Sequence, residues 1–531
     1  MEQRSDRTTG RPTAADRRLA VLLAAAMFVL VVDTSFMNVS ISAVVRDLGT
    51  TVSGVQTAIA LEALVSAAFI LAGSKIGDLV GRRRAYVIGL VGYGTGAVAM
   101  TLAQSLTAVV VLWSVVGGLG AALLLPAMQS LVHGNFEGPS RKAAYALVGA
   151  AASIAAAVGP LLGGVITTTL SWRVAFGLEA VVVAVVLVGV RLVRDVPYTG
   201  ERSFDVVGTV LSVTGMGGIV LGVLVWQEGG EAVGALVLVG AAALVGLGVW
   251  LVRRARAGRT TLVDPALFRS PAFRIGVSQQ LLQQVALGGA MIALPVFLQM
   301  ALGYDALLAG ISLAPLSLTM FASALLVGRR PTRRRPATRV LAGFLLLVVG
   351  MGALVVVVPR ATSGWWLAVP LVVAGAGLGL LVSQLNAYTL SPVPEERASE
   401  AAGVSSAGGS FGLSLGLAMA GAVMLASLAS GFVARTEAST VLPPDDKQQV
   451  ARVLEDDAEV MSDAQLTTLL ADEPPAVQEE ILLINDDVRA RALQVALLVP
   501  LGAGLLGVLA ALRMRRLPDP ETKGSAPPVL G

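Results

Sequence analysis

The sequence predicts an all-α membrane protein with fourteen transmembrane helices, arranged as two six-helix bundles plus two inserted helices. Hydrophobic residues make up 55% of the 531 residues, charged residues only 14%, and the mean hydropathy is +0.77. Soluble globular domains carry about 25% charged residues. The apolar residues also gather into runs of the roughly 20 residues that a helix needs to cross a bilayer. These observations exclude an ordinary soluble protein.

Fourteen apolar runs are each long enough to form a membrane-spanning helix. They cover residues 19–45, 54–74, 85–104, 108–132, 143–168, 174–193, 205–226, 232–252, 272–300, 306–328, 339–358, 364–389, 399–432 and 490–513. Because the number of spans is even, both ends of the chain are expected on the same side of the membrane.

Lys and Arg residues indicate which side that is. With both tails and the even-to-odd loops in the cytoplasm, all but eight of the 39 Lys and Arg residues are cytoplasmic. The exceptions are Arg46, Arg173, Arg360, Arg435, Lys447, Arg452, Arg489 and Arg491. Since cytoplasmic loops are enriched in Lys and Arg, the sequence predicts a multi-pass protein of the plasma membrane with both termini in the cytoplasm.

The loops between the spans divide the chain into domains. Linkers at 194–204 and 253–271 set one pair of helices apart. Basic residues follow both the second and the tenth span, which indicates two similar halves that rock about a midplane site. The expected parts are a cytoplasmic tail (1–18), an N-terminal six-helix bundle (19–194), two additional helices (205–252), a C-terminal six-helix bundle (272–514) and a second cytoplasmic tail (515–531).

An external loop, residues 433–489, interrupts the C-terminal bundle. It is rich in Asp and Glu and carries consecutive prolines at 443–444 and 474–475. The spacing of its apolar residues predicts short amphipathic helices that lie over the extracellular face. These residues are Val450, Val453, Leu454, Val460 and Met461. We expect a surface appendage rather than a catalytic domain.

The residue inventory argues against several kinds of chemistry. Without cysteine the chain has no disulfide and no thiolate, and a single histidine, His133, cannot build a multi-histidine metal centre. The sequence also lacks the Gly-x-x-x-x-Gly-Lys-Ser/Thr pattern of a phosphate-binding loop. The net charge of +4 does not indicate nucleic-acid binding, because the charges are segregated by membrane side. We therefore expect neither an enzyme, nor a metal site, nor a nucleic-acid partner.

The loop after the second span, residues 74–84, holds one acid, two glycines and four cations. Its glycines, one of them Gly81, suit a tight reversal of the chain. Asp78 could cap the following helix or form an ion pair with an arginine such as Arg82. The alternative for Arg82 and Arg83 is a basic cytoplasmic loop that only follows the charge rule.

Three carboxyl groups lie inside predicted spans: Asp33 in the first, Glu62 in the second and Glu179 in the sixth. Ionisable residues inside a membrane are costly and commonly functional. Burial favours the protonated form of a carboxyl group, so such a group can carry protons, and its negative charge can attract a cationic substrate. The alternative is a carboxylate that is hydrogen-bonded to Ser or Thr for packing.

Amides in the spans have two interpretations, because they could hold polar parts of a substrate or join helices. The ninth span carries Gln279, Gln280, Gln283 and Gln284. Residues four apart share a helix face, so one pair, Gln279 and Gln283, is expected in the substrate cavity. The other candidates for the cavity are Asn38, Gln384 and Asn386.

Glycines in two spans predict close helix contacts. In the fifth span Gly159, Gly163 and Gly164 accompany Pro160, which permits close packing and a local bend. In the thirteenth span Gly408, Gly412 and Gly416 form a tandem Gly-x-x-x-Gly pattern.

Four short motifs follow one another along the chain. They are Val32-Asp33-Thr34-Ser35-Phe36-Met37-Asn38-Val39-Ser40-Ile41, Asp78-x-x-Gly81-Arg82-Arg83, Gly159-Pro160-Leu161-Leu162-Gly163-Gly164 and Ser171-Trp172-Arg173. Together they resemble the fourteen-helix drug:proton antiporter branch of the major facilitator superfamily. Its helix-4 pattern Arg-x-x-Gln-Gly is replaced by Ser114-Val115-Val116-Gly117-Gly118, so the membrane arginine associated with proton coupling is missing. Ser42, Ser74 and Leu79 also depart from the family pattern.

The resemblance implies a proton-coupled exporter of small amphipathic, antibiotic-like or cationic compounds that works by alternating access. Asp33, assisted by Glu62 and Glu179, would exchange protons for substrate, while Asp78 and Arg82 would latch the cytoplasmic side. It implies a monomer in the lipid bilayer that uses the proton gradient and no cofactor. The alternatives are a dedicated transporter of a metabolite, lipid or siderophore, and a membrane sensor or scaffold that does not transport.

Overall fold

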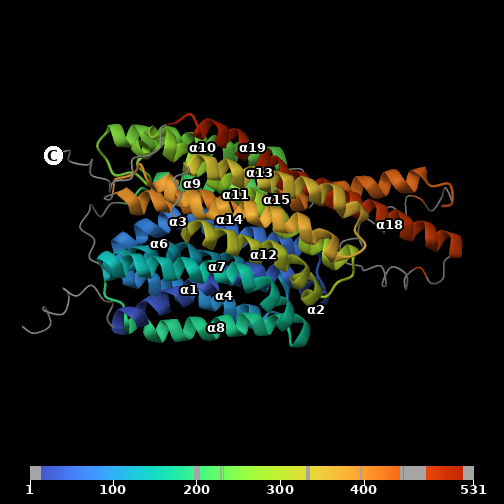
Figure 1. Ribbon diagram of the computed structural model, residues 1–531, viewed down its shortest axis with the longest axis horizontal. Coiled ribbons are helices and arrows are strands. Elements are labelled where there is room, and N and C mark those ends of the chain that lie inside the picture. Colours follow the sequence, from blue (N-terminus) through green and yellow to red (C-terminus); the bar gives the residue numbers. More distant parts are fainter. Residues whose placement is uncertain are drawn as a thin grey trace, which may run out of the picture.

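The computed structural model describes residues 14–195, 204–227, 230, 232–329, 335–394, 397–442, 447, 470 and 474–517. Over these ranges the chain is helical and contains no β-strand. Within the described ranges, fourteen helices are long and apolar enough to cross a membrane, which agrees with the predicted number. They lie side by side as one elongated bundle (Figure 1).

The first half of the chain forms the spans up to Leu192. Its elements are α1 (Ala14–Val39), α2 (Ile41–Leu48), α3 (Val52–Val80), α4 (Arg82–Leu102), α5 (Leu106–Ala108), the π-helix η3 (Val109–Gly117), α6 (Gly118–Asn135), α7 (Gly138–Thr169), α8 (Trp172–Gly189) and the 3₁₀ turn η4 (Val190–Leu192). We call these elements the first half.

The second half begins after a pair of helices, α9 (Val206–Gln227) and α10 (Val233–Arg256), which pack on each other. Its elements are α11 (Pro271–Val296), the π-helix η6 (Phe297–Ala301), α12 (Ala306–Arg329), α13 (Pro336–Val357), α14 (Ala368–Leu390), α15 (Ala398–Ala438), α18 (Pro475–Ala496) and α19 (Leu498–Met514). Short 3₁₀ turns precede α11 (η5, Pro265–Arg269) and α14 (η7, Val358–Arg360, and η8, Gly364–Leu367).

The two ends of the bundle are different. The helix α1 begins and α19 ends at the same end, as an even number of spans requires, and we call this the tail end. The opposite end, the loop end, holds α2 (Figure 1). There α2 is anchored to α8, because Asp47 accepts a hydrogen bond from Trp172 Nε1 at 3.0 Å and forms an ion pair with Arg173.

The first span is shorter than the sequence predicts, because α1 ends at Val39 instead of continuing to residue 45. The break falls at Ser40, whose hydroxyl group is 2.7 Å from the Thr167 hydroxyl group of α7. Apolar residues continue beyond the break into α2, so hydropathy alone does not reveal it.

The expected external loop is shorter at both ends, since α15 extends to Ala438 and α18 begins at Pro475. The two helices project from the bundle as a hairpin (Figure 1). A small apolar core and the ion pair between Arg435 and Asp487 hold them together. Acidic residues lower the hydropathy here, although the helical spacing of Ile481, Ile484 and Val488 persists. The apolar residues from 450 to 461, on which the prediction of surface helices rested, lie outside the described residues.

Glycines bring α15 close to α11, as the tandem Gly-x-x-x-Gly pattern predicts. A Cβ atom at Gly412 would lie about 3.1 Å from Cα of Leu281, and one at Gly416 would lie 2.8 Å from Cα of Val285. Because only glycine permits such an approach, α15 packs directly on the backbone of α11.

Candidate functional site

The three intramembrane carboxyl groups come together inside the first half. Asp33 lies on α1, Glu62 on α3 and Glu179 on α8. Asp33 is only 2% exposed and Glu179 only 3%, whereas Glu62 is half-buried. The carboxyl groups interact electrostatically with one another. We call this group of three the carboxylate cluster.

Asp33 is held by the indole of Trp113. The Trp113 Nε1–H group donates to both carboxylate oxygens at 3.1 Å. Trp113 belongs to the π-helix η3, and π-helical turns are frequent at functional sites. The indole packs edge-on against Phe176 of α8, with ring centroids 6.2 Å apart. The π-helix thus presents a neutral donor to the buried acid.

Tyr93 of α4 also borders the cluster. Its hydroxyl group is within reach of the Asp33 carboxylate and donates to the Val29 carbonyl oxygen at 3.3 Å. Neither Tyr93 nor Trp113 was predicted from the sequence. The available signal was that a Trp or Tyr inside an apolar run needs a hydrogen-bond partner for its polar atom. Ser114, which stands where the family pattern has arginine, donates instead to the Ala58 carbonyl oxygen at 2.7 Å.

Glu179 differs from Asp33 in its surroundings. Among the described residues neither of its carboxylate oxygens has a hydrogen-bond partner. Burying an ionised carboxylate without a partner is costly, and three such charges in one place repel one another. The cluster is therefore suited to binding protons. Within the described ranges, no group of three or more His, Asp or Glu side chains is placed to hold a metal ion.

The predicted substrate-cavity amides lie on three helices, α1, α11 and α14. Gln279 and Gln283 of α11 are 0% and 2% exposed, and the amide atoms of Gln279 have no partner among the described residues. This pair follows Gly276, which packs against Thr389 of α14. The adjacent Gln280 and Gln284 contact Gly409 of α15 instead.

The remaining amides have other neighbours. Gln384 accepts a hydrogen bond from Arg339 of α13 at 3.3 Å, and Asn386 is exposed. Asn38 is 1% exposed, and its side-chain amide donates to the Thr34 carbonyl oxygen at 2.8 Å. Its backbone carbonyl oxygen accepts a hydrogen bond from Gln299. These side chains lie on α1, α11 and α14, and so come from both halves. Their role in a substrate cavity stays a prediction.

At the tail end, Asp78 forms an ion pair with Arg82, and Arg82 Nη1 donates to the Ser130 hydroxyl group of α6 at 2.6 Å. Of the two roles predicted for Asp78 the structure therefore has the ion pair, while Gly81 occupies the N-cap of α4. Gly81 has a φ of 105°, a conformation that favours glycine. Asp195, which was not predicted from the sequence, accepts a hydrogen bond from the backbone N–H group of Arg83 at 3.0 Å.

The glycines of α7 pack toward two different helices near the loop end. A Cβ atom at Gly159 would lie 2.6 Å from Cβ of Ser35, and one at Gly163 would lie 3.1 Å from Cα of Phe36, both on α1. Gly164 faces the backbone of α12 instead, where its Cβ would lie 3.0 Å from Cα of Leu307. Because α12 belongs to the second half, α7 joins the two halves. Pro160 lies within this continuous helix.

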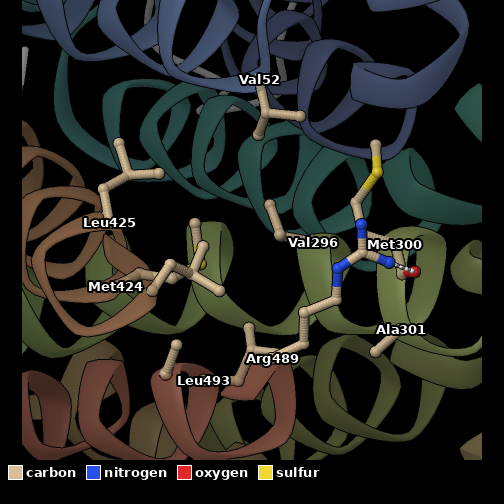
Figure 2. A pocket seen from close by; sticks show the side chains of 10 residues that line it. Val52, Val296, Met300, Ala301, Met424, Leu425, Arg489 and Leu493 are labelled. Carbon is tan, nitrogen blue, oxygen red and sulfur yellow. Dashed lines mark hydrogen bonds between the residues drawn. The ribbon is translucent and has the colours of Figure 1, made fainter. Parts of the chain in front are cut away.

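A small pocket lies at the loop end, and Figure 2 shows the side chains that line it. The residues of the carboxylate cluster are not among them. The pocket is formed by the start of α3 together with η6, α15 and α18. Its lining is apolar except for one side chain, Arg489 of α18, which is 5% exposed. None of the site residues predicted from the sequence lines it.

Fourteen membrane-length helices, two halves in close contact and a buried carboxylate cluster define a multi-pass membrane transporter. The chain belongs to the Major Facilitator Superfamily, whose family description matches residues 23–417. This confirms the family that the four sequence motifs indicate.

Known proteins support the assignment. The chain is 28% identical to the "Probable actinorhodin transporter" of Streptomyces coelicolor over 81% of this chain and 77% of that protein. It is 29% identical to "Multidrug resistance protein Stp" of Mycobacterium tuberculosis over 81% of this chain and 80% of that protein. In fold it is similar to the crystal structure of a bacterial homologue of the human lysosomal transporter Spinster, with a TM-score of 0.60 and 12% identity over 96% and 99% of the two chains.

Proposed function

We propose that this protein is a proton-coupled exporter of small amphipathic drugs or antibiotics, working by alternating access. The observation that carries the proposal is the carboxylate cluster inside the first half of a major facilitator fold. The export of drug-like compounds is supported by the relatives, one named as an antibiotic transporter and one as a multidrug resistance protein.

Proton coupling follows from the mutual repulsion of the three acids. When Asp33, Glu62 and Glu179 are ionised together, each charge raises the energy of the others, and binding a proton relieves this repulsion. A cationic substrate near the cluster relieves it in the same way. Proton and substrate therefore compete for the same negative charge, and this competition makes transport of one depend on release of the other.

Trp113 takes part by stabilising one ionisation state. Its N–H group can donate to a carboxylate but cannot accept a proton, so it favours ionised Asp33 without adding a positive charge. Trp113 lies in the fourth span, which lacks the membrane arginine of the family pattern. In this protein the Trp113 N–H group provides the polar contact to Asp33. No cofactor enters this scheme; the energy comes from the proton gradient.

The orientation of the protein follows from its charges. We place the tail end in the cytoplasm and the loop end outside the cell, because most Lys and Arg residues lie in tail-end loops. The present conformation is joined at the loop end, where the Leu307 N–H group of α12 donates to the Thr168 hydroxyl group of α7 at 3.1 Å. In the opposite conformation the Asp78–Arg82 pair would support closure of the tail end. The proposed unit is a monomer in the plasma membrane.

A dedicated transporter of a single compound is the second candidate. It is favoured by the relative that is named for one compound, actinorhodin. A panel of structurally unrelated drugs distinguishes the two, since a multidrug exporter lowers the sensitivity of its host to several of them and a dedicated one to a single class.

The test of proton coupling is drug-induced proton movement in inverted membrane vesicles. We expect Asp33→Asn and Glu62→Gln to abolish it, because each removes one proton site. Glu479→Gln is a matched control, since Glu479 is an exposed acid on α18. If both cluster variants move protons and drug at the rate of the unmodified protein, the cluster does not couple transport.

A further inference from the structure

Gln299 joins the two halves of the molecule at the loop end. It lies in η6 of the second half and is 4% exposed. Its Oε1 atom accepts from the backbone N–H group of Ser42 at 3.1 Å, and its Nε2 group donates to the backbone carbonyl oxygen of Asn38 at 3.4 Å. One side chain therefore contacts both α1 and α2 of the first half.

Gln299 contacts the Ser42 N–H group and the Asn38 carbonyl oxygen. These are backbone groups that a break in a helix leaves without an intrahelical partner. The first N–H groups and the last C=O groups of a helix have no intrahelical partner. The break at Ser40 creates such groups at the end of α1 and at the start of α2. Both contacts are buried, and an unsatisfied backbone group in an apolar environment is costly. A glutamine amide suits this place because it donates and accepts at once.

Arg489 holds η6 from the other side. Its Nη1 group donates at 3.3 Å to the backbone carbonyl oxygen of Met300, which is the residue after Gln299. Figure 2 shows the guanidinium group reaching from α18 to Met300. The helix α18 is one arm of the projecting hairpin, so the hairpin is connected to the segment that carries Gln299.

We propose that Gln299 is the latch of the loop-end gate and that Arg489 positions it. The proposal rests on the alternating-access part of the proposed function. In the closed state Gln299 satisfies the backbone at the α1–α2 break, where water is excluded. When the halves separate, water entering from the loop end can satisfy the same groups. The latch therefore favours closure without preventing opening.

The chain has no cysteine, so a single introduced cysteine reports the gate without background labelling. The reporter is Thr34→Cys, on α1 one turn closer to the tail end than Asn38 and half-buried. A separate variant with a cysteine at the exposed Val441 first identifies the loop side of the membrane, as the side from which a membrane-impermeant maleimide labels it. The same maleimide is then added to the reporter variant from that side. Neither drug nor proton gradient is needed, so failure of the proposed transport function would not affect this measurement.

Removing the latch should open the loop end. We expect Gln299→Leu to raise the labelling rate of the cysteine at position 34 by about tenfold, which corresponds to about 1.4 kcal/mol. Gln299→Glu keeps the shape of the side chain but, when ionised, loses the donor, and should give a smaller increase. Arg489→Met should raise labelling less than Gln299→Leu, because it acts only through η6.

The matched control is Gln494→Leu, because the Gln494 amide donates to the Val355 carbonyl oxygen at 3.0 Å with both partners in the second half. It should leave labelling unchanged. The proposal is wrong if folded Gln299→Leu and Gln299→Glu proteins label at the rate of the parent, or if Gln494→Leu raises labelling as much as Gln299→Leu. Thermal unfolding in detergent verifies that each variant is folded.

Discussion

Two π-helical segments, one in each half, contact α1 only five residues apart. The first, η3, directs the Trp113 N–H group to the Asp33 side chain, and the second, η6, directs the Gln299 amide to the Asn38 backbone. A π-helical turn widens the helix locally and changes the direction of its side chains. Both segments use this to place a polar group against the same helix.

The difference between the two contacts lies in what they stabilise. Trp113 contacts a carboxylate, so its hydrogen bond depends on the protonation state of Asp33. Gln299 contacts backbone groups that do not titrate, so its hydrogen bonds depend on whether the halves are together. One helix, α1, thus meets a group sensitive to protons and a group sensitive to position. This suggests separate substitutions that should affect transport and gating independently.

The largest effect is expected at the acid itself. Asp33→Asn keeps an acceptor for the Trp113 N–H group but removes the charge, so proton-coupled drug transport should be lost. The measurement is drug accumulation in vesicles with an imposed pH gradient. The loop-end accessibility of a cysteine at position 34 should stay within about twofold of the parent. A large change in that accessibility would show that the two contacts on α1 are not separable.

Trp113→Phe should weaken transport without abolishing it. The substitution keeps one aromatic ring near Phe176 but removes the pyrrole ring of the indole together with its N–H donor. A hydrogen bond to a charged group contributes about 1.5–3 kcal/mol, so kcat/KM for drug should fall by about tenfold to a hundredfold. Trp366→Phe is the control, since Trp366 is exposed on the second half. Equal losses in both variants would contradict a specific role for the indole.

A smaller loss is expected at the tail end. Asp78→Asn removes the charge that pairs with Arg82 and should slow transport several-fold, while Arg84→Ala, at an exposed position in the first turn of α4, should not. Initial transport rates at saturating drug provide the comparison. Equal rates for Asp78→Asn and the parent protein would remove this ion pair from the transport cycle.

The smallest effect is expected on the surface of the hairpin. Arg435 and Asp487 are both about 40% exposed, and exposed ion pairs contribute about 0–1 kcal/mol. Arg435→Ala should therefore change the unfolding temperature slightly and transport not at all. A transport defect as large as that of Arg489→Met would mean that the hairpin acts through its surface and not through η6.

Much of this molecule follows from composition and from the cost of burying charge. The apolar runs predicted all fourteen spans, and the three intramembrane acids were identified because charges are rare in hydrocarbon. The partners of the acids could not be predicted, because a π-helical turn at Trp113 leaves no trace in hydropathy. The same holds for the break at Ser40, on which the role of Gln299 depends.

The amides show a second limit of the sequence. Gln279, Gln280, Gln283 and Gln284 form two pairs on neighbouring faces of α11, and spacing alone cannot tell which pair faces which helix. The direction of each pair depends on where α14 and α15 pack against α11. That packing involves Gly276, which contacts Thr389, and Gly409, which contacts Gln280 and Gln284. In each contact the two residues are more than 100 positions apart in the sequence. Side-chain chemistry was predictable here, but its direction was not.

The length of α15 has a mechanical consequence. At about 1.5 Å per residue a helix of 41 residues is roughly 60 Å long, about twice the hydrocarbon thickness of a bilayer. This single helix thus extends from the interface between the halves into the projecting hairpin. A tilt of about 10° at its inner part displaces a tip about 30 Å away by roughly 5 Å. A small movement of the buried helices is therefore enlarged at the outer end of α15. A fluorescent label at this end would report that movement from outside the membrane.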